Sequence, residues 1–325
     1  MSTVISIINW KGGVGKTTLT HHIGIQMQYT AYDESKYPET SGFPRTLLLD
    51  LDPQCNLSVA CLGEDTFEKR VWGEKKQTKV TQKISTVKDL FELYLESKLD
   101  NVDPNLYILK ESIRSSKNNI YTYVDLLPSH PDLIYTDMDI AVYSKAGFRN
   151  NLMKSEIYKF QIVHTFIKKL REKYDFILID CPPNLNYVTQ NALYESDYYL
   201  IPTILDKLSS YGILSIKNKV DELNQMFTSN IGDDYKTTEL AGIVANNVRE
   251  YDGAPKQTQS NVLNSLKKTF GKKVFKNYLT YGDGIARALE VGYPVFALET
   301  NSLDNVWKQS TMLKKITKEL FDRIK

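Results

Sequence analysis

One short stretch near the start of the chain combines glycine, lysine and threonine in a spacing suited to phosphate chemistry. It runs from Trp10 to Thr18 and reads WKGGVGKTT. Glycines let backbone N–H groups approach a polyphosphate without a Cβ clash, and a helix that follows adds the positive end of its dipole. In such a loop Lys16 would neutralise phosphate charge and the Thr17 hydroxyl would bind Mg²⁺, so the stretch predicts a site for ATP and Mg²⁺. The residues predicted to bind the triphosphate are Gly12, Gly13, Val14, Gly15, Lys16, Thr17 and Thr18.

The loop departs from the ordinary phosphate-loop pattern at its first position. That pattern, G-x-x-x-x-G-K-[ST], has glycine where this chain has Trp10. A second lysine, Lys11, stands directly before the glycine pair. This extra lysine distinguishes the loop from ordinary phosphate loops, and the loop pattern alone does not determine which group Lys11 contacts.

Three aspartates close apolar segments and could act on a bound triphosphate. Asp50 and Asp52 flank Leu51 at the end of one segment, and Asp180 ends another. Nucleotides bind at the carboxyl ends of the strands of a parallel sheet, so these carboxylates are expected beside the loop. One of the first two could orient or deprotonate the attacking water, and Asp180 would hold Mg²⁺ through water. The predicted metal-binding residues are Thr17, Asp52 and Asp180, although an aspartate at a strand end can instead cap a helix.

Apolar segments alternate with helical patterns along the chain, and these elements must position the site. Short aliphatic runs predict six strands, at 3–9, 46–52, 122–128, 175–180, 198–204 and 240–248. The runs are almost continuously apolar, which indicates a parallel sheet covered on both faces. Helices are predicted at 16–29, 151–174, 209–227, 258–270 and 302–324. We expect a single doubly wound α/β domain over residues 1–325, with a mostly parallel sheet flanked by helices and surface insertions at 31–44 and 63–86.

The motifs together resemble a known family. The run KGGVGKTT, with DLDPQCN at 50–56 and DFILIDCPP at 175–183, closely resembles the ParA/MinD class of deviant Walker A ATPases. The segments LLPSHPDL at 126–133 and VGYPVFAL at 291–298 are also similar to that family, so the resemblance covers most of the chain. It implies a P-loop NTPase fold and an enzyme that hydrolyses ATP to ADP and phosphate with Mg²⁺.

The resemblance also implies roles for single residues. In this family the early lysine, here Lys11, reaches across a two-fold axis to the phosphates of the partner subunit. Two ATP-bearing faces concentrate negative charge that a lysine from each side would offset, so ATP should favour a homodimer. Family position assigns the attacking water to Asp52, which makes Lys11, Lys16 and Asp52 the expected catalytic residues. Asn246 and Asn247 would contact the adenine edge, although asparagines also end strands for reasons of turn geometry.

The resemblance is strongest to ParA-type DNA partition ATPases without an N-terminal helix-turn-helix, because only ten residues precede Lys11. Such a protein binds non-specific DNA as an ATP dimer on the nucleoid and releases it when a centromere-binding, ParB-like partner stimulates hydrolysis. The net charge is only +2, but residues 266–287 hold six Lys/Arg against one acid. DNA contacts are expected to be with phosphates and therefore to lack sequence preference. The predicted DNA-binding residues are Arg249, Lys256, Lys267, Lys268, Lys272, Lys273, Lys276 and Arg287.

Three other functions are alternatives to DNA partition. An apolar stripe within 302–325 is compatible with a MinD-like, membrane-associated positioning ATPase, but the last helix of this fold packs on the sheet, which argues against membrane binding. An iron–sulfur reductase needs cysteines in glycine-rich loops, whereas Cys55, Cys61 and Cys181 lie beside the acidic motifs. A metabolite-activating ATP enzyme of related fold is the third alternative. The stripe consists of Val306, Trp307, Leu313, Ile316, Leu320 and Ile324.

The composition is that of an ordinary globular chain. With 325 residues, 42% hydrophobic and 25% charged, the chain can bury a sizeable core. No apolar run approaches the roughly 18 residues needed to span a bilayer, and the first residues lack the cationic start of a signal peptide. The three cysteines have no metal-ligand spacing, which fits a reducing compartment. We expect a cytoplasmic protein.

Overall fold

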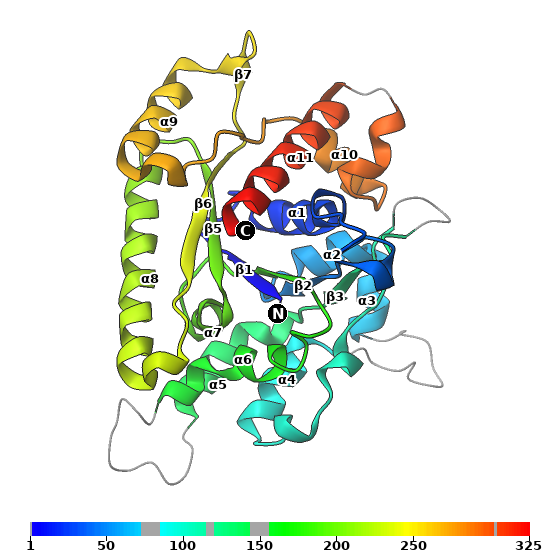
Figure 1. Cartoon of the computed structure of the whole chain (residues 1–325), viewed down its shortest axis with the longest axis vertical. Helices are drawn as coiled ribbons and strands as arrows, with labels where there is room; N and C mark the ends of the chain where they lie inside the picture. The colour runs from blue at the N-terminus through cyan, green and yellow to red at the C-terminus, as the bar shows by residue number, and fades with distance from the viewer. Residues whose placement is uncertain (1, 73–84, 115–119, 144–155, 302–303) are drawn as a thin grey trace.

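A six-stranded parallel sheet forms the centre of the molecule (Figure 1). The computed structural model describes residues 2–72, 85–114, 120–143, 156–301 and 304–325. The strands lie in the order β3-β2-β4-β1-β5-β6, and every neighbouring pair is parallel. Their bounds are β1 (Thr3–Ile7), β2 (Thr46–Asp50), β3 (Val124–Leu127), β4 (Phe176–Asp180), β5 (Tyr198–Ile204) and β6 (Glu239–Asn246). All six predicted strands are present, and the doubly wound α/β fold is confirmed.

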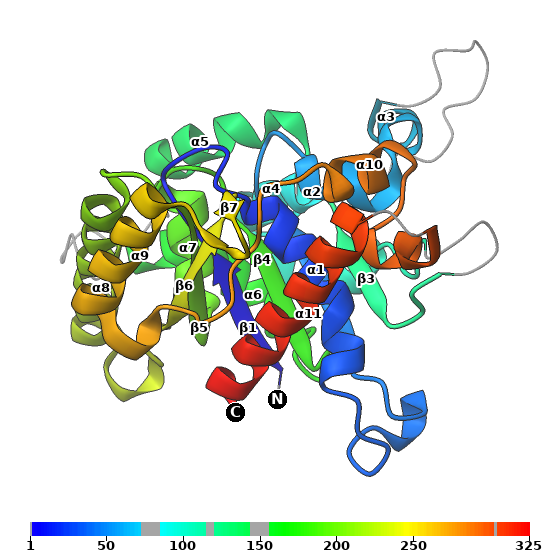
Figure 2. The same cartoon turned by 90° about the horizontal axis from the view of Figure 1, so that it is seen from above.

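Helices cover both faces of this sheet, which explains why its strands are apolar throughout (Figure 2). On one face, Ile5 and Ile7 of β1 belong to the same core as α1 (Lys16–Thr30) and α11 (Asp304–Ile324). On the other face, Val4 joins a core built mainly with four further helices. Successive residues of a strand point to opposite faces, so β1 contributes to both cores. The helices of the second face are α4 (Val87–Leu95), α6 (Ile162–Ile167), α7 (Tyr187–Glu195) and α8 (Ser209–Ile231).

The remaining elements flank these layers. Their bounds are α2 (Asn56–Leu62), α3 (Glu64–Trp72), α5 (Thr136–Val142), β7 (Glu250–Tyr251), β8 (Ala254–Pro255), α9 (Gln257–Phe270) and α10 (Gly284–Glu290). The short 3-10 turns are η1 (Pro38–Thr40), η2 (Leu99–Asn101), η3 (Pro104–Tyr107), η4 (Pro131–Tyr135), η5 (Ile157–Phe160), η6 (Gly232–Asp234), η7 (Gly271–Lys273) and η8 (Val295–Asn301).

The two stretches predicted as surface insertions have local structure of their own where they are described. Residues 31–44 form a loop around η1 in which the N–H of Asp33 donates to the carbonyl of Gly42 (2.8 Å). In the second stretch, Phe67 and Val71 of α3 pack on Cys55. Residues 73–84 of this stretch lie outside the described residues.

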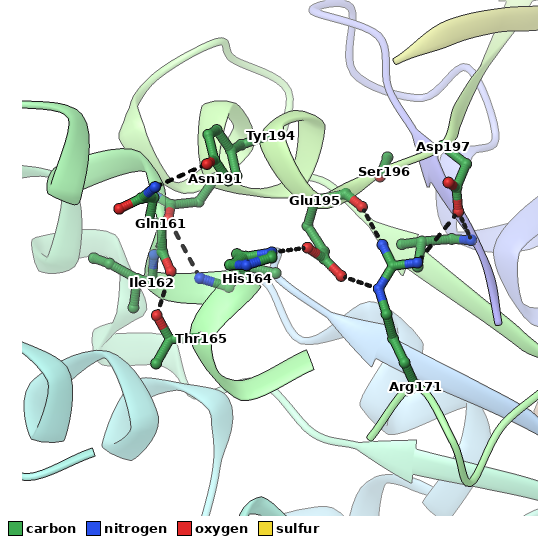
Figure 3. Close-up of polar contacts among 12 residues, drawn as sticks. Gln161, Ile162, His164, Thr165, Arg171, Asn191, Tyr194, Glu195, Ser196 and Asp197 are labelled. Carbon is green, nitrogen blue, oxygen red and sulfur yellow. Dashed lines mark hydrogen bonds and ion pairs between the residues drawn. The ribbon is translucent and has the colours of Figure 1, made fainter. Parts of the chain in front are cut away.

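The prediction of one continuous helix at 151–174 is wrong. Its first five residues lie outside the described residues, and the chain then forms η5 and the short helix α6 in place of one helix. Asn191 of α7 explains the break, since its side-chain oxygen accepts from the N–H of Ile162 at 2.8 Å (Figure 3). The amide of Asn191 also donates to the carbonyl of Lys159 (2.7 Å). These bonds satisfy backbone groups that would otherwise be left free between the two turns.

A buried ion-pair network fastens the amino edge of the sheet (Figure 3). Glu195, the last residue of α7, is 3% exposed; its carboxylate accepts from Arg171 Nε (2.8 Å) and contacts His164 Nδ1 (2.6 Å). Next to it, Asp197 accepts from the N–H of Val4 at 2.9 Å. Because these residues come from α6 and the turn after it, from α7 and from the starts of β1 and β5, the network holds one helical layer against β1 and β5.

Residues 274–281, here named the strap, lie along the outer edge of β6 as an extended segment that the sequence analysis did not predict. The N–H groups of Phe275 and Leu279 each donate to a β6 carbonyl at 2.9 Å, and parallel bridges form at both ends of the segment. Gly242 of β6 permits this approach, since a Cβ there would lie 2.3 Å from the Phe275 ring. The strap therefore covers the edge of the sheet next to β6.

Helix α11 uses its apolar stripe in the core. Leu313, Ile316 and Leu320 are fully buried against α1 and the sheet, whereas Trp307 is 61% exposed. The stripe therefore belongs to the packed interior of the fold, as the sequence analysis favoured. Across the described ranges, no helix has both the length and the apolarity needed to cross a bilayer.

Candidate nucleotide site

The glycine loop connects β1 to α1 in a conformation that only glycine adopts easily at two positions. Gly13 has a φ of 71° and Gly15 a φ of 90°. A Cβ on Gly15 would also lie 1.8 Å from the side-chain nitrogen of Asn246. That nitrogen donates to the carbonyl of Val14 at 2.8 Å. The end of β6 therefore braces the loop directly.

Lys16 and Thr17 open α1 beside the carboxylate that ends β4. Pairing between β1 and β4 sets Ile7 opposite Asp180, which brings the aspartate under the loop. Thr17 Oγ1 donates to Asp180 Oδ2 at 2.6 Å. Lys16 is 7% exposed, and burial lowers its pKa while the charges of Asp180 and Asp52 oppose that shift. Burial raises the pKa of Asp180 well above its usual range.

The two aspartates that follow β2 have different surroundings. Asp50 is fully buried; it accepts from Ser58 Oγ (2.7 Å) and from the N–H of Asp52 (3.1 Å). Burial raises the pKa of Asp50 to about 7. Asp52 faces the pocket, accepts from the N–H of Gln54 (2.9 Å) and has a pKa raised by burial. Asp50 thus holds the turn that presents Asp52.

A pocket of about 420 Å³ brings the loop and Asp52 together and is named here the nucleotide pocket. Its far wall is the end of the strap and the start of α10, which the sequence analysis did not single out. Gln309 of α11 secures this wall: its amide nitrogen donates to the carbonyl of Thr280 (3.0 Å), and its oxygen accepts from the N–H of Ile285 (2.9 Å). The residues of the nucleotide pocket used below are Gly12, Gly13, Val14, Gly15, Lys16, Thr17, Thr18, Asp52, Asn246, Asn247, Leu279, Thr280, Gly282, Ile285 and Gln309.

The structure gives Asn246 a supporting role that the sequence analysis did not predict. Both polar atoms of its side chain bond to nearby backbone, the nitrogen to the carbonyl of Val14 and the oxygen to the N–H of Asn247 (2.7 Å). It supports the phosphate loop through these bonds, and its contact with an adenine edge stays a prediction. Asn247 is exposed on the pocket wall with a φ of 54°, and its contact with adenine stays a prediction.

Lys11 lies outside the nucleotide pocket of its own chain. Its ammonium group forms an ion pair with Asp206, which follows β5, and its side chain is 47% exposed. Asp206 also accepts from Ser209 Oγ (2.9 Å) and from the N–H of Leu208 (3.1 Å). The sequence analysis did not identify Asp206, which is distant from Lys11 along the chain.

The pocket residues fit a triphosphate with Mg²⁺. A Cβ added to Gly12 or Gly13 would meet nothing within 4 Å, so the loop backbone borders open space. The free N–H groups and positive dipole end of α1 begin at Lys16. Bound Mg²⁺ would be held by Thr17, with Asp180 behind it, and would offset charge on the phosphates. Asp52 is the carboxylate of the pocket that can orient the attacking water.

The predicted DNA-binding residues divide among separate places. Lys267, Lys272, Lys273 and Lys276 line a groove of about 1380 Å³ between the end of α9 and α11, named here the basic groove. Helix α11 adds four further cations to it. Lys268 lies on α9 outside this lining, Arg249 and Lys256 flank the β7–β8 hairpin, and Arg287 pairs with Asp283 on α10. The α11 cations are Lys314, Lys315, Lys318 and Arg323.

Fold and site together define a P-loop nucleoside triphosphatase. A family model described as an AAA domain matches residues 2–232, and the protein belongs to that family. An uncharacterized protein of Methanocaldococcus jannaschii is 26% identical over 307 residues, 92% of each chain. The chromosome partitioning protein ParA of Myxococcus xanthus is 24% identical over 226 residues, 68% of this chain and 59% of the relative. With the family match, these relatives identify a ParA/MinD-type ATPase, as the motifs predicted.

Solved structures share the fold. McdA of Cyanothece, in an ATP complex, has a TM-score of 0.67 and 17% identity over 99% of this chain and 96% of that one. A cobyrinic acid a,c-diamide synthase of Mycobacterium smegmatis, with an ATP analogue and magnesium, has a TM-score of 0.64 and 19% identity over 100% and 96%. A plasmid partition protein of Borrelia burgdorferi has a TM-score of 0.60 and 18% identity over 98% and 99%. At these identities the likeness establishes the fold alone.

Proposed function

We propose that this protein is an ATPase that forms a homodimer when it binds ATP and Mg²⁺, binds DNA without sequence preference in that state, and acts in DNA partition. A ParB-like partner would stimulate hydrolysis and so end the DNA-bound state. The chromosome partitioning relative and the partition protein of similar fold support this class of cargo. The observation that carries the proposal is the position of Lys11.

The ammonium group of Lys11 is available to a second copy of the chain. It lies outside its own nucleotide pocket, about half exposed, in an ion pair with Asp206. An exposed pair of this kind contributes roughly 0–1 kcal/mol, so a stronger anion can replace the carboxylate. The phosphates of a facing, ATP-loaded copy would be such an anion. Dimerisation would then depend on the nucleotide.

A single substitution tests the role of Lys11. Lys11→Ala should still bind ATP but remain a monomer in sedimentation experiments with a non-hydrolysable ATP analogue, in which the wild type forms a dimer. Lys207→Ala removes an exposed lysine beside Asp206 and serves as a matched control that should dimerise normally. An ATP-dependent dimer of Lys11→Ala would refute the proposed trans contact.

The basic groove supports the DNA part of the proposal. Eight of its lining residues are Lys or Arg, against the three acids Glu239, Glu319 and Asp322. Such a surface binds the regularly spaced phosphates of a duplex. A mobility-shift assay on random-sequence duplex with ATP, ADP or no nucleotide tests it, and binding is expected with ATP only. Absence of binding in every state, with ATP turnover that needs neither DNA nor a partner protein, would favour a metabolite-activating enzyme instead.

A further inference from the structure

The nucleotide pocket and the basic groove lie at opposite ends of β6, and the strap joins them. The groove includes Leu240 at the start of β6, and the pocket includes Asn246 at its end. The first residue of the strap, Val274, lines the groove, whereas Leu279 and Thr280 line the pocket. A short extended segment therefore runs directly from one site to the other.

Helix α11 holds the pocket end of the strap through Gln309. This side chain is 3% exposed, and its amide nitrogen donates to the carbonyls of Thr280 (3.0 Å) and Gly282 (3.2 Å). Its oxygen accepts from the N–H of Ile285 at 2.9 Å. All three bonds go to backbone of the pocket wall, so the wall cannot shift without carrying α11 along or breaking buried hydrogen bonds.

The same helix holds the groove end of the strap. The carboxylate of Glu319 accepts from the N–H groups of Lys276 (2.9 Å) and Asn277 (3.0 Å). Arg323 donates to the carbonyls of Lys272 (2.7 Å) and Val274 (3.2 Å). These contacts fix the backbone that carries groove lysines relative to the lysines of α11 itself.

We propose that the strap and α11 transmit the state of the nucleotide pocket to the basic groove, with Gln309 as the positioning residue at the pocket end. The inference rests on the proposed function, because it names how the nucleotide regulates the DNA-binding surface. A nucleotide that fills the pocket would contact the wall formed by Leu279, Thr280 and Gly282, which line it. Any movement of that wall passes through Gln309 and the strap to Lys272 and Lys276.

The groove is sensitive to such a movement because its cations stand on separate elements. Lys272 lies in η7 and Lys276 in the strap, whereas Lys314 and Lys318 lie on α11. Several lysines must meet successive phosphates at the same time, so a change in their relative spacing alters affinity without any change in net charge. Coupling between two sites typically changes the affinity at one of them by roughly 5- to 150-fold, and we expect a change in DNA affinity within this range.

Hydrogen exchange of a parent protein with an intact Gln309, and of the same protein with Gln309→Leu, tests the inference without DNA. Both proteins carry Lys11→Ala, so that dimer formation does not contribute. On addition of a non-hydrolysable ATP analogue, the parent should show altered exchange at the phosphate loop and at 271–278. In Gln309→Leu the phosphate loop should respond as before, while the response at 271–278 is lost. A parent without a response at 271–278, or a Gln309→Leu variant that keeps it, would overturn the inference.

Two further variants separate the role of Gln309 from a general loss of packing. Gln309→Glu keeps an acceptor for Ile285 but has no donor for the carbonyls of Thr280 and Gly282, so it should lose part of the response. Trp307→Ala, at an exposed position of the same helix, should respond like the parent. Thermal melting by circular dichroism confirms that each variant is folded. A reduced response in Trp307→Ala equal to that of Gln309→Leu would overturn the assignment to Gln309.

DNA binding gives a second readout. With Lys11 intact, the affinity for random duplex should be higher with the ATP analogue than with ADP, and Gln309→Leu should bring the ratio of the two affinities toward one. An unchanged ratio in Gln309→Leu would count against the inference. If the wild type fails to bind DNA with any nucleotide, the proposed function fails, while the exchange measurement still decides whether pocket and groove are coupled.

Discussion

The two edges of the sheet use charge in opposite ways. At the carboxyl edge, Lys16, Asp52 and Asp180 are buried around the phosphate loop, where charges interact strongly. At the amino edge, Lys272 and Lys276 of the basic groove are exposed, where water and salt weaken each contact. One substitution in the nucleotide pocket should therefore abolish ATP binding or hydrolysis. Each substitution in the basic groove should instead reduce DNA affinity by a small and similar amount. The predictions below test this difference in order of decreasing effect.

Lys16→Ala should abolish ATP binding. Lys16 is the buried cation of the nucleotide pocket, and its loss leaves the phosphates and the carboxylates of Asp52 and Asp180 without a buried cationic partner. Removal of one partner from a buried charge group costs about 3–5 kcal/mol, which corresponds to at least roughly 100-fold in affinity. Calorimetric titration with Mg-ATP measures it. An affinity within tenfold of the wild type would show that Lys16 does not contact the phosphates.

Asp52→Ala should bind ATP yet lose hydrolysis by roughly 10²- to 10⁴-fold, the usual contribution of a general base. The wild type adds a pH test. Burial raises the pKa of Asp52, and a protonated carboxyl cannot accept a proton, so turnover should fall as the pH drops through that raised value. Phosphate release at a series of pH values measures both effects. Normal turnover of Asp52→Ala would move the catalytic role to another residue.

Stability should fall in mild acid because of two histidines behind the phosphate loop. His21 and His22 of α1 are fully buried, and burial lowers the pKa of His22 from 6.5 to about 4 and that of His21 well below its usual value. Below pH 6.5 the two histidines become protonated in the unfolded chain but stay neutral in the folded chain. The free energy of unfolding that they contribute is therefore fully present above pH 6.5 and is lost as the pH falls toward 4. For His22 alone the loss between pH 7 and pH 5 is about 2 kcal/mol.

Urea unfolding at pH 7, 6 and 5 measures that loss. The neutral ring of His22 pairs its Nδ1 with the carbonyl of Thr18 (2.8 Å) and accepts from the N–H of Val295 at Nε2 (3.2 Å). His22→Gln removes the titrating group, so its stability should depend less on pH than that of the wild type. Equal pH dependence of the two proteins would show that His22 is not the source.

The smallest expected effects are those of single groove lysines. Lys272→Gln and Lys276→Gln should each weaken DNA binding a few-fold, equally for all sequences, and reduce the salt slope by about one. Lys256→Gln and Arg287→Gln, which alter predicted DNA-binding residues outside the groove, are the matched controls. Titrations of labelled duplex at several salt concentrations measure the slopes. Larger losses in the controls than in the groove variants would place the DNA surface near the nucleotide pocket.

The sequence pointed to most residues that line the nucleotide pocket, because those expected to contact the phosphates are consecutive. Residues 12–18 form the loop and the first residues of α1, and the strand ends next to Asp52 and Asp180 are marked by apolar runs. Asp206 and Gln309 were missed because the fold brings them to Lys11 and to the pocket wall from far along the chain. Contacts between residues that lie far apart in the chain produce no pattern in the local sequence.

The surface and irregular parts of the fold were less predictable for similar reasons. The eight predicted DNA-binding cations are close in sequence, yet the chain turns between α9, the hairpin and α10 and disperses them. The strap pairs with β6 through isolated bridges, which leave no regular alternation to recognise. The helix predicted at 151–174 is interrupted between η5 and α6, where the side chain of Asn191 from another helix bonds to the backbone of both.

The strap has a consequence for how copies of this protein can assemble. The strap forms hydrogen bonds with backbone groups on the outer side of β6. At the opposite edge of the sheet, Leu109 exchanges two backbone hydrogen bonds with Leu126 of β3 (2.7 and 2.9 Å). Both lateral margins of the sheet are thus occupied by the chain's own segments, so neither presents a long bare strand for another chain to extend. Addition of a strand from a second copy to either of these edges is therefore disfavoured, and with it a ribbon-like polymer built by strand addition.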